Sequence, residues 1–208
     1  MEWIGLISSD LESPKPDTVG SMKDALLLEG LNCQFRAVLN DIERCRKCVT
    51  KRWRGDACDA FNTVIKREIK QCHDFARAVD FYVGELKGIS PDRLTRKQTP
   101  ARAKSESYQS KIQFKVFTAD LARGARMMQE SADAMQNVLN RMVGVLSRQI
   151  PERPFRMPGS SRPEADFSKL RRKLLQLSLQ FHENAHDLRE IYRVYESAEQ
   201  SLKQQQTR

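Results

Sequence analysis

The chain has 208 residues and a formal net charge of +9 at pH 7. Charged residues make up 30% of it and aromatic residues only 7%, which argues against a sheet-rich protein and for a helical one with a large solvated surface. It holds no run of about 18 apolar residues, so we expect no membrane-spanning helix. No basic stretch precedes its first apolar residues, so we also expect no conventional signal peptide.

The first 20 residues contain Pro14, Pro16 and Gly20 and show little periodicity, which indicates a flexible N-terminal arm. Ser21 and Asp24 then have the spacing of a helix-capping box. From there apolar residues recur every three or four positions, which predicts one buried face of a helix. This first stripe consists of Leu28, Leu31, Phe35, Val38, Ile42, Cys45 and Val49.

Trp53-Arg54-Gly55 follows the first stripe and predicts a tight turn. Glycine can adopt a positive φ and end a helix, and Asp56 can cap the next helix. A second stripe with the same spacing comes after the turn and is interrupted at Glu68: Cys58, Phe61, Ile65, Cys72, Phe75, Val79, Tyr82 and Leu86. Residues 21–88 therefore predict a helical hairpin with a large aromatic residue at its tip.

Residues 89–107 contain two prolines and five basic residues, which indicates a basic linker. A second hairpin is predicted over 108–205, with a proline-rich turn at 151–163 and a polar tail at 206–208. Its first helix carries the third stripe: Phe114, Phe117, Leu121, Met128, Met135, Val138, Met142 and Val145. Its second helix carries the fourth, interrupted at Asn184: Phe167, Leu170, Leu174, Leu177, Phe181, Leu188, Ile191, Tyr195, Ala198 and Leu202.

Four amphipathic helices in two hairpins can bury all four stripes against one another in a four-helix bundle. The spacing is close to 3.5 residues, which favours a long seam like that of a coiled coil. The predicted fold class is therefore all-α, with two long antiparallel helical hairpins that form a bundle or a coiled-coil-like rod.

A second motif lies near the end of the fourth stripe. Tyr195 and Glu199 are four residues apart, and so share one face of the helix, and Tyr192 and Glu196 form an overlapping copy. A W-x-G tripeptide at a hairpin tip, together with Tyr-x-x-x-Glu near the end of a helix, resembles the W-x-G helical-hairpin family of bacterial type VII secretion substrates and partners. In length the chain is similar to relatives with an L-x-G domain.

This resemblance implies a non-enzymatic protein without a cofactor, recognised by the membrane ATPase of the secretion system through Trp53, Gly55, Tyr195 and Glu199. The chain would be a substrate, or a targeting partner or chaperone of one. It would lie in the bacterial cytoplasm before export and be secreted or cell-surface afterwards. Its partner would be a helical chain, a toxin or a second copy of itself.

The two halves of such an export mark lie on different hairpins. The linker at 89–107 can extend over about 60 Å, which is enough to run back along the second helix and bring Tyr195 beside Trp53. We expect this arrangement. The alternatives are that Trp53 is a hydrophobic plug at the hairpin tip and that Tyr195 is a core position of its stripe.

Basic residues gather at and before the turn: Arg44, Arg46, Lys47, Lys51, Arg52 and Arg54. Such a patch can attract nucleic acid or an acidic protein. A basic coiled-coil interaction module is therefore the alternative function, although binding of nucleic acid is the weaker form of it. A solvated face near the C-terminus of a helix, where cations suit the helix dipole, would have the same composition.

His182, Glu183 and His186 have the spacing H-E-x-x-H of a zinc protease. The positions where a metzincin has glycine and its third histidine hold Arg189 and Tyr192 instead. The helical frame also points both histidines toward solvent. We therefore expect no metal site and no enzymatic activity.

The five cysteines allow three interpretations. Cys48 and Cys58 lie at matching levels of the predicted hairpin, which would suit a disulfide near its tip. The pair Cys45 and Cys48 has the spacing of zinc ligands. However, Cys45, Cys58 and Cys72 fall on core stripes and Cys33 does not, which favours free and mostly buried thiols.

Overall fold

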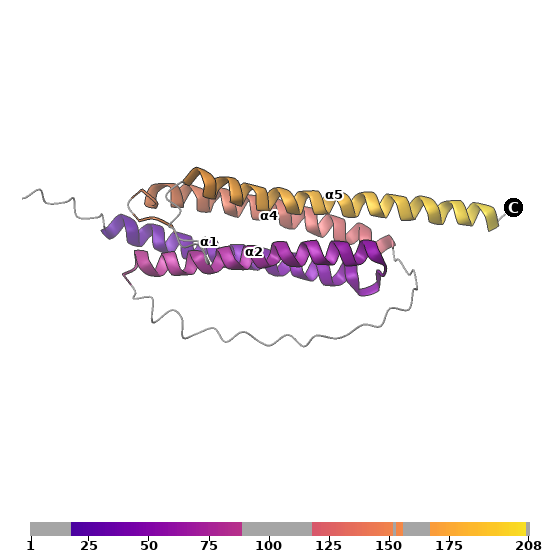
Figure 1. Cartoon of the computed structure of the whole chain (residues 1–208), viewed down its shortest axis with the longest axis horizontal. Helices are drawn as coiled ribbons and strands as arrows, with labels where there is room; N and C mark the ends of the chain where they lie inside the picture. The colour runs from indigo at the N-terminus through magenta and orange to yellow at the C-terminus, as the bar shows by residue number, and fades with distance from the viewer. Residues whose placement is uncertain (1–17, 89–117, 152, 156–166, 207–208) are drawn as a thin grey trace, which may run out of the picture.

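The computed structural model describes residues 18–88, 118–151, 153–155 and 167–206. The described parts contain four long helices, α1 (Thr18–Arg52), α2 (Asp56–Leu86), α4 (Thr118–Gln149) and α5 (Phe167–Gln206). They pack lengthwise into an elongated bundle of two hairpins (Figure 1). This confirms the predicted all-α class. None of the described helices combines the length and the apolar character needed to cross a membrane.

The directions of the helices follow from contacts near their ends. Arg148 of α4 binds Asp24 near the start of α1 at 2.7 Å, and Arg52 at the end of α1 binds Asp120 near the start of α4 at 2.6 Å. Helices α1 and α4 are therefore antiparallel, as are the two helices of each hairpin (Figure 1). It follows that α2 and α4 run in one direction, whereas α1 and α5 run in the other.

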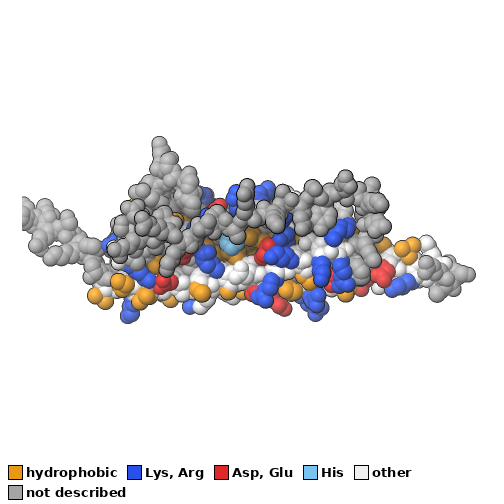
Figure 2. All heavy atoms as spheres, turned by 90° about the horizontal axis from the view of Figure 1, so that it is seen from below, with side chains coloured by type: hydrophobic (Ala, Val, Ile, Leu, Met, Phe, Trp, Pro, Cys, Tyr) orange, Lys and Arg blue, Asp and Glu red, His pale blue; other side chains and the backbone are white. Residues whose placement is uncertain are grey.

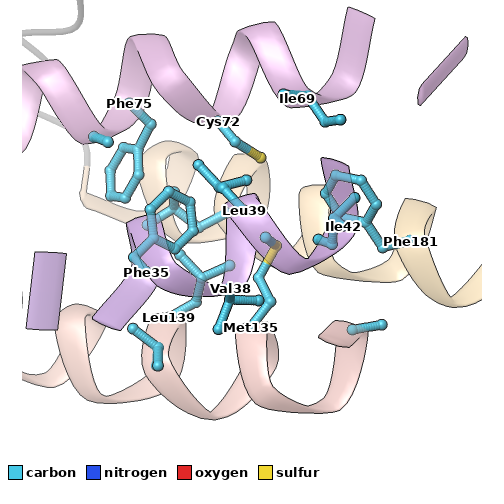
Figure 3. Packing of buried hydrophobic residues seen from close by; sticks show 14 of the residues in the cluster. Phe35, Val38, Leu39, Ile42, Ile69, Cys72, Phe75, Met135, Leu139 and Phe181 are labelled. Carbon is cyan, nitrogen blue, oxygen red and sulfur yellow. The ribbon is translucent and has the colours of Figure 1, made fainter. Parts of the chain in front are cut away.

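All four helices contribute to one hydrophobic core. Figure 3 shows its middle, where Phe35 and Leu39 of α1, Phe75 of α2, Leu139 of α4 and Phe181 of α5 point into the space between the helices. The rings of Phe35 and Phe75 meet edge to face, with centroids 5.6 Å apart. Every described residue of the first three stripes is buried, so the apolar periodicity identified these core faces correctly.

The fourth stripe is buried only along part of its length. Leu174, Phe181 and Leu188 are buried, whereas Ala198 and Leu202 are exposed. The reason is that α5 continues past the end of the first hairpin (Figure 1), so its last turns meet none of the other described helices. Helix α5 does extend over the whole of the fourth stripe, but the expectation that Ala198 and Leu202 are buried is wrong.

The start of α1 also differs from the prediction. The helix begins at Thr18, ahead of the proposed capping box. Ser21 is buried against α4, where its Oγ donates a hydrogen bond to Oε1 of Gln149 at 3.4 Å. The side chain of Ser21 therefore joins two helices and does not cap one.

Several predicted segments lie outside the described residues. They are 1–17 of the N-terminal arm, the whole basic linker at 89–107, the first part of the second hairpin at 108–117, most of the proline-rich turn at 151–163, and 207–208 of the tail. The side chains of Phe114, Phe117, Phe167 and Leu170 are among those not described.

Candidate functional site

The turn between α1 and α2 consists of Trp53, Arg54 and Gly55, as predicted. Trp53 is only 1% exposed, and its ring packs at a tilt on Phe61 of α2, with centroids 5.8 Å apart. Gly55 has a φ of 112°, a conformation that residues with a Cβ rarely adopt. The glycine therefore makes the reversal possible, while the tryptophan seals the end of the hairpin.

Polar groups complete the turn. Arg54 folds back so that Nη1 donates to the carbonyl oxygens of Thr50 and Trp53, both at 2.8 Å, which satisfies acceptors at the end of α1. Gly55 occupies the N-cap position of α2, and no side chain caps this helix. The prediction that Asp56 is the cap is wrong. Asp56 is the first helical residue, where the positive end of the helix dipole stabilises its negative charge.

The Tyr-x-x-x-Glu motif lies on the far part of α5. Tyr195 is half-buried and packs against the core, whereas Glu199 is exposed and forms an ion pair with Lys203 at 3.0 Å. In the overlapping copy the two side chains bind each other, because the hydroxyl of Tyr192 donates to Glu196 at 2.5 Å. This bond raises the pKa of Tyr192 above its ordinary value.

The two motifs lie at the same end of the bundle. Asn184 of α5 binds Glu68 of α2 at 2.6 Å and fixes the level of these antiparallel helices. At about 1.5 Å per residue, the start of α2 lies about 18 Å from Glu68, and Tyr195 lies about 17 Å from Asn184 in the same direction. The structure therefore has the helix directions that we expected, with Tyr195 at the end of the molecule that carries Trp53.

The basic residues before the turn do not form an open field of positive charge. Three of them bind carboxylates of their own helix: Arg44 binds Asp41, and Arg46 and Lys47 share Glu43. Two others are occupied as well, since Arg52 binds Asp120 and Arg54 binds carbonyl oxygens. Lys51 is exposed. On the described surface in Figure 2, Lys and Arg side chains stand among Asp and Glu.

The H-E-x-x-H residues do not share a site. His182 lies against α4, with Nδ1 3.0 Å from Nε2 of Gln129 and Nε2 3.7 Å from a carboxylate oxygen of Asp133. The expectation that His182 points to solvent is therefore wrong, because α4 covers it. His186 is exposed, as expected, and Glu183 is exposed beside it. Within the described ranges no three His, Cys, Asp or Glu side chains gather as metal ligands.

All five cysteines are free thiols. Cys45, Cys58 and Cys72 are buried and Cys33 is exposed, which confirms the assignment made from the stripes. Burial raises the pKa of the Cys45 and Cys72 thiols to about 12. These two side chains are therefore uncharged at neutral pH and act as part of the core.

Glu68 and Asn184 form a buried polar pair that the sequence did not predict. Glu68 and Asn184 were each recognised only as an interruption of a stripe, yet they face each other between α2 and α5. Glu68 is 3% exposed, and burial raises its pKa to about 6, although the hydrogen bond from Asn184 opposes this rise. Two interruptions on different helices were the available signal, but only the tertiary arrangement shows that they meet.

Comparison with known proteins adds no relative. No protein-family model matches the chain, and neither a curated protein nor a solved structure matches it significantly. The resemblance to the W-x-G family therefore rests on Trp53, Gly55, Tyr195 and Glu199 themselves.

Proposed function

We propose that this chain is a non-enzymatic helical protein of a type VII-like secretion system, either an exported substrate or a targeting partner or chaperone for one. The observation that carries the proposal is that Trp53-Arg54-Gly55 and Tyr195-x-x-x-Glu199 occur at one end of a single chain. A receptor could bind both motifs together there. The membrane ATPase of such a system is the proposed receptor, and the bacterial cytoplasm before export is the proposed starting compartment.

The two motifs would contribute differently. Trp53 is buried and Gly55 determines the path of the backbone, so both would act by shaping the turn. The groups available to a receptor are on α5, where residues 193, 194 and 197–205 are exposed. A helix that projects from a bundle can be bound in the groove of a partner through side chains three and four residues apart. Glu199 is exposed, and the half-buried Tyr195 and Glu196 lie four and three residues before it on the same face of the helix.

The alternative of a basic module is less well supported. Binding to nucleic acid depends mainly on cations that can replace counterions at the phosphates. Five of the six basic residues near the turn already have partners within the chain. A partner with phosphates would have to compete with these bonds.

The proposal is tested by measuring export from a bacterium that carries a type VII system. Glu199→Gln removes the exposed carboxylate without touching the core, and we expect it to reduce the exported fraction severely. The matched control is Glu190→Gln, which removes a carboxylate earlier on the same helix and should leave export unchanged. Both variants should melt at the temperature of the wild type.

The overlapping motif requires a second variant. Glu196→Gln removes the partner of the Tyr192 hydroxyl, and the double variant with Glu199→Gln removes both carboxylates of the two copies. Undiminished export of the double variant would show that the Tyr-x-x-x-Glu motif has no role, and the proposal would be abandoned.

A further inference from the structure

The first half of α1 has an unusual outer face. Six residues at intervals of three and four positions are exposed, and all are apolar or small: Val19, Met22, Leu26, Gly30, Cys33 and Ala37. We call them the outer stripe. Val19 is 75% and Leu26 is 56% exposed. Figure 2 shows hydrophobic side chains gathered at the end of the molecule where α1 begins.

The outer stripe lies opposite the core face of the same helix. At 100° per residue it is centred about 180° from the buried residues Leu28 and Phe35. Farther along α1 the same outward face carries Arg44, Lys47 and Lys51. A helix face turned to water is ordinarily polar throughout, so only the first half of this face departs from the rule.

The stripe repeats after eleven residues, so that Val19, Met22 and Leu26 correspond to Gly30, Cys33 and Ala37. An eleven-residue repeat keeps a stripe nearly parallel to the helix axis, which suits a straight partner helix. The first three residues are large and the last three are small. A Cβ added at Gly30 would meet nothing within 4 Å, so this part of the surface is open.

We propose that the outer stripe binds the outer stripe of a second copy of this chain, with the two α1 helices antiparallel. Pairing about a twofold axis near residue 28 places each large residue against a small one. Val19 then meets Ala37 of the second copy, Met22 meets its Cys33, and Leu26 meets its Gly30. This surface is independent of the proposed export function, which depends on the other end of the bundle.

The edges of the stripe can be followed in the same pairing. Glu29 binds Lys87 of α2 at 2.7 Å and lies beside the proposed axis. The two Glu29 side chains would approach each other there, and the ion pair that each forms with its own Lys87 offsets the like charges. On the other edge Lys23 would lie near Gln34 of the second copy, and the two Leu27 side chains, each 43% exposed, would meet at the axis.

Cysteine cross-linking tests the pairing in the full-length chain with Cys48→Ser as background. With Met22→Cys, the new thiol lies beside Cys33 of the second copy, and we expect rapid oxidation to a disulfide-linked dimer. Cross-linking should be lost when Cys33→Ser is added. Without Met22→Cys it should also be absent, because the two Cys33 residues would be about 15 Å apart along the axis. Arg44→Cys, on the charged half of the same face, is the matched control.

Sedimentation measures the association without cross-linking. The stripe is short, so we expect a weak dimer with a dissociation constant on the order of micromolar. Leu26→Glu should weaken it about tenfold or more while leaving the melting temperature unchanged. A monomer at every concentration, as expected if residues 1–17 or another protein cover the stripe, would overturn the proposal. So would cross-linking of Cys33 to Cys33 in the background chain, which indicates parallel helices.

Discussion

The two turns, one toward each end of the bundle, both place a buried aromatic residue in the core. At one end Trp53 packs on Phe61. At the other, Phe155 from the proline-rich turn packs on Phe75 and Tyr82, with ring centroids 6.0 and 5.3 Å away. Both plugs are at most 1% exposed. A buried aromatic thus fixes each turn to the core, and Trp53 needs no further role to explain its burial.

The ends differ in how the turn is held and in what surrounds it. At the Phe155 end the hydroxyl of Tyr82 donates to the carbonyl of Arg153 at 2.7 Å, and Arg153 donates back to the carbonyl of Glu85 at 2.8 Å. At the Trp53 end the turn depends on Gly55, and α5 runs on beyond it (Figure 1). What distinguishes the Trp53 end is therefore the projecting helix.

Removing each plug gives the largest expected effect. Trp53→Ala and Phe155→Ala should each lower the free energy of unfolding by about 3 to 5 kcal/mol, because each leaves a cavity in the core. Urea titration followed by circular dichroism measures both losses, with Trp53→Phe as a milder control. If Trp53→Ala costs less than about 1 kcal/mol while Phe155→Ala costs the full amount, Trp53 is not a structural plug.

Changing the turn glycine gives the next largest effect. Gly55→Ala should cost about 1 to 3 kcal/mol, because alanine must be forced into a φ of 112°. The matched control is Gly144→Ala in α4, where an added Cβ meets nothing within 4 Å. That change should stabilise the helix by about 0.5 to 1 kcal/mol. If both substitutions change the free energy of unfolding by the same amount, the turn does not depend on the positive φ of Gly55.

The polar pair between α2 and α5 gives the smallest effect, and it depends on pH. The pKa of Glu68 in the folded chain, about 6, lies above its ordinary value of 4.5. The protonated form is therefore favoured by folding, and stability is lost as the pH rises from about 4.5 through about 6. Glu68→Gln should raise the free energy of unfolding by about 1 to 2 kcal/mol near pH 7.5 and change it little near pH 4.

The matched control for this pair is Glu130→Gln, which removes an exposed carboxylate of α4 that does not act on the pKa of Glu68. It should leave the pH dependence of unfolding as it is in the wild type. A pH profile that is the same with and without Glu68→Gln would show that Glu68 does not titrate with a raised pKa.

The sequence allowed the helices, the Trp53 turn and most core positions to be predicted. The reason is that the spacing of three and four residues in a stripe such as Leu28 to Val49 identifies the face of the helix that is buried. Phe155 could not be found in this way, since it lies in a turn without periodicity. Nor could the spacing show that the partner helices end before Leu202. The cap at Asp56 was mistaken because glycine alone satisfied the geometry of the turn.

For the candidate site, the spacing Tyr-x-x-x-Glu could be read directly, but which copy forms a bond depends on side-chain geometry. Tyr192 binds Glu196, whereas Glu199 forms an ion pair with Lys203. The charge partners of Arg52 and His182 come from α4, which only the tertiary fold brings near. For that reason the patch of basic residues looked more open in the sequence than it is.

Joint recognition of the W-x-G turn and the Tyr-x-x-x-Glu motif requires that both lie at one end of one chain. Electron paramagnetic resonance can measure the distance between spin labels at Ala57→Cys and Ser197→Cys, both exposed positions, after Cys33 and Cys48 are replaced by serine. We expect a distance below about 30 Å, because both labels lie at similar levels along the bundle. A distance above about 45 Å, the length of α2 at about 1.5 Å per residue, would place the motifs at opposite ends and contradict joint recognition.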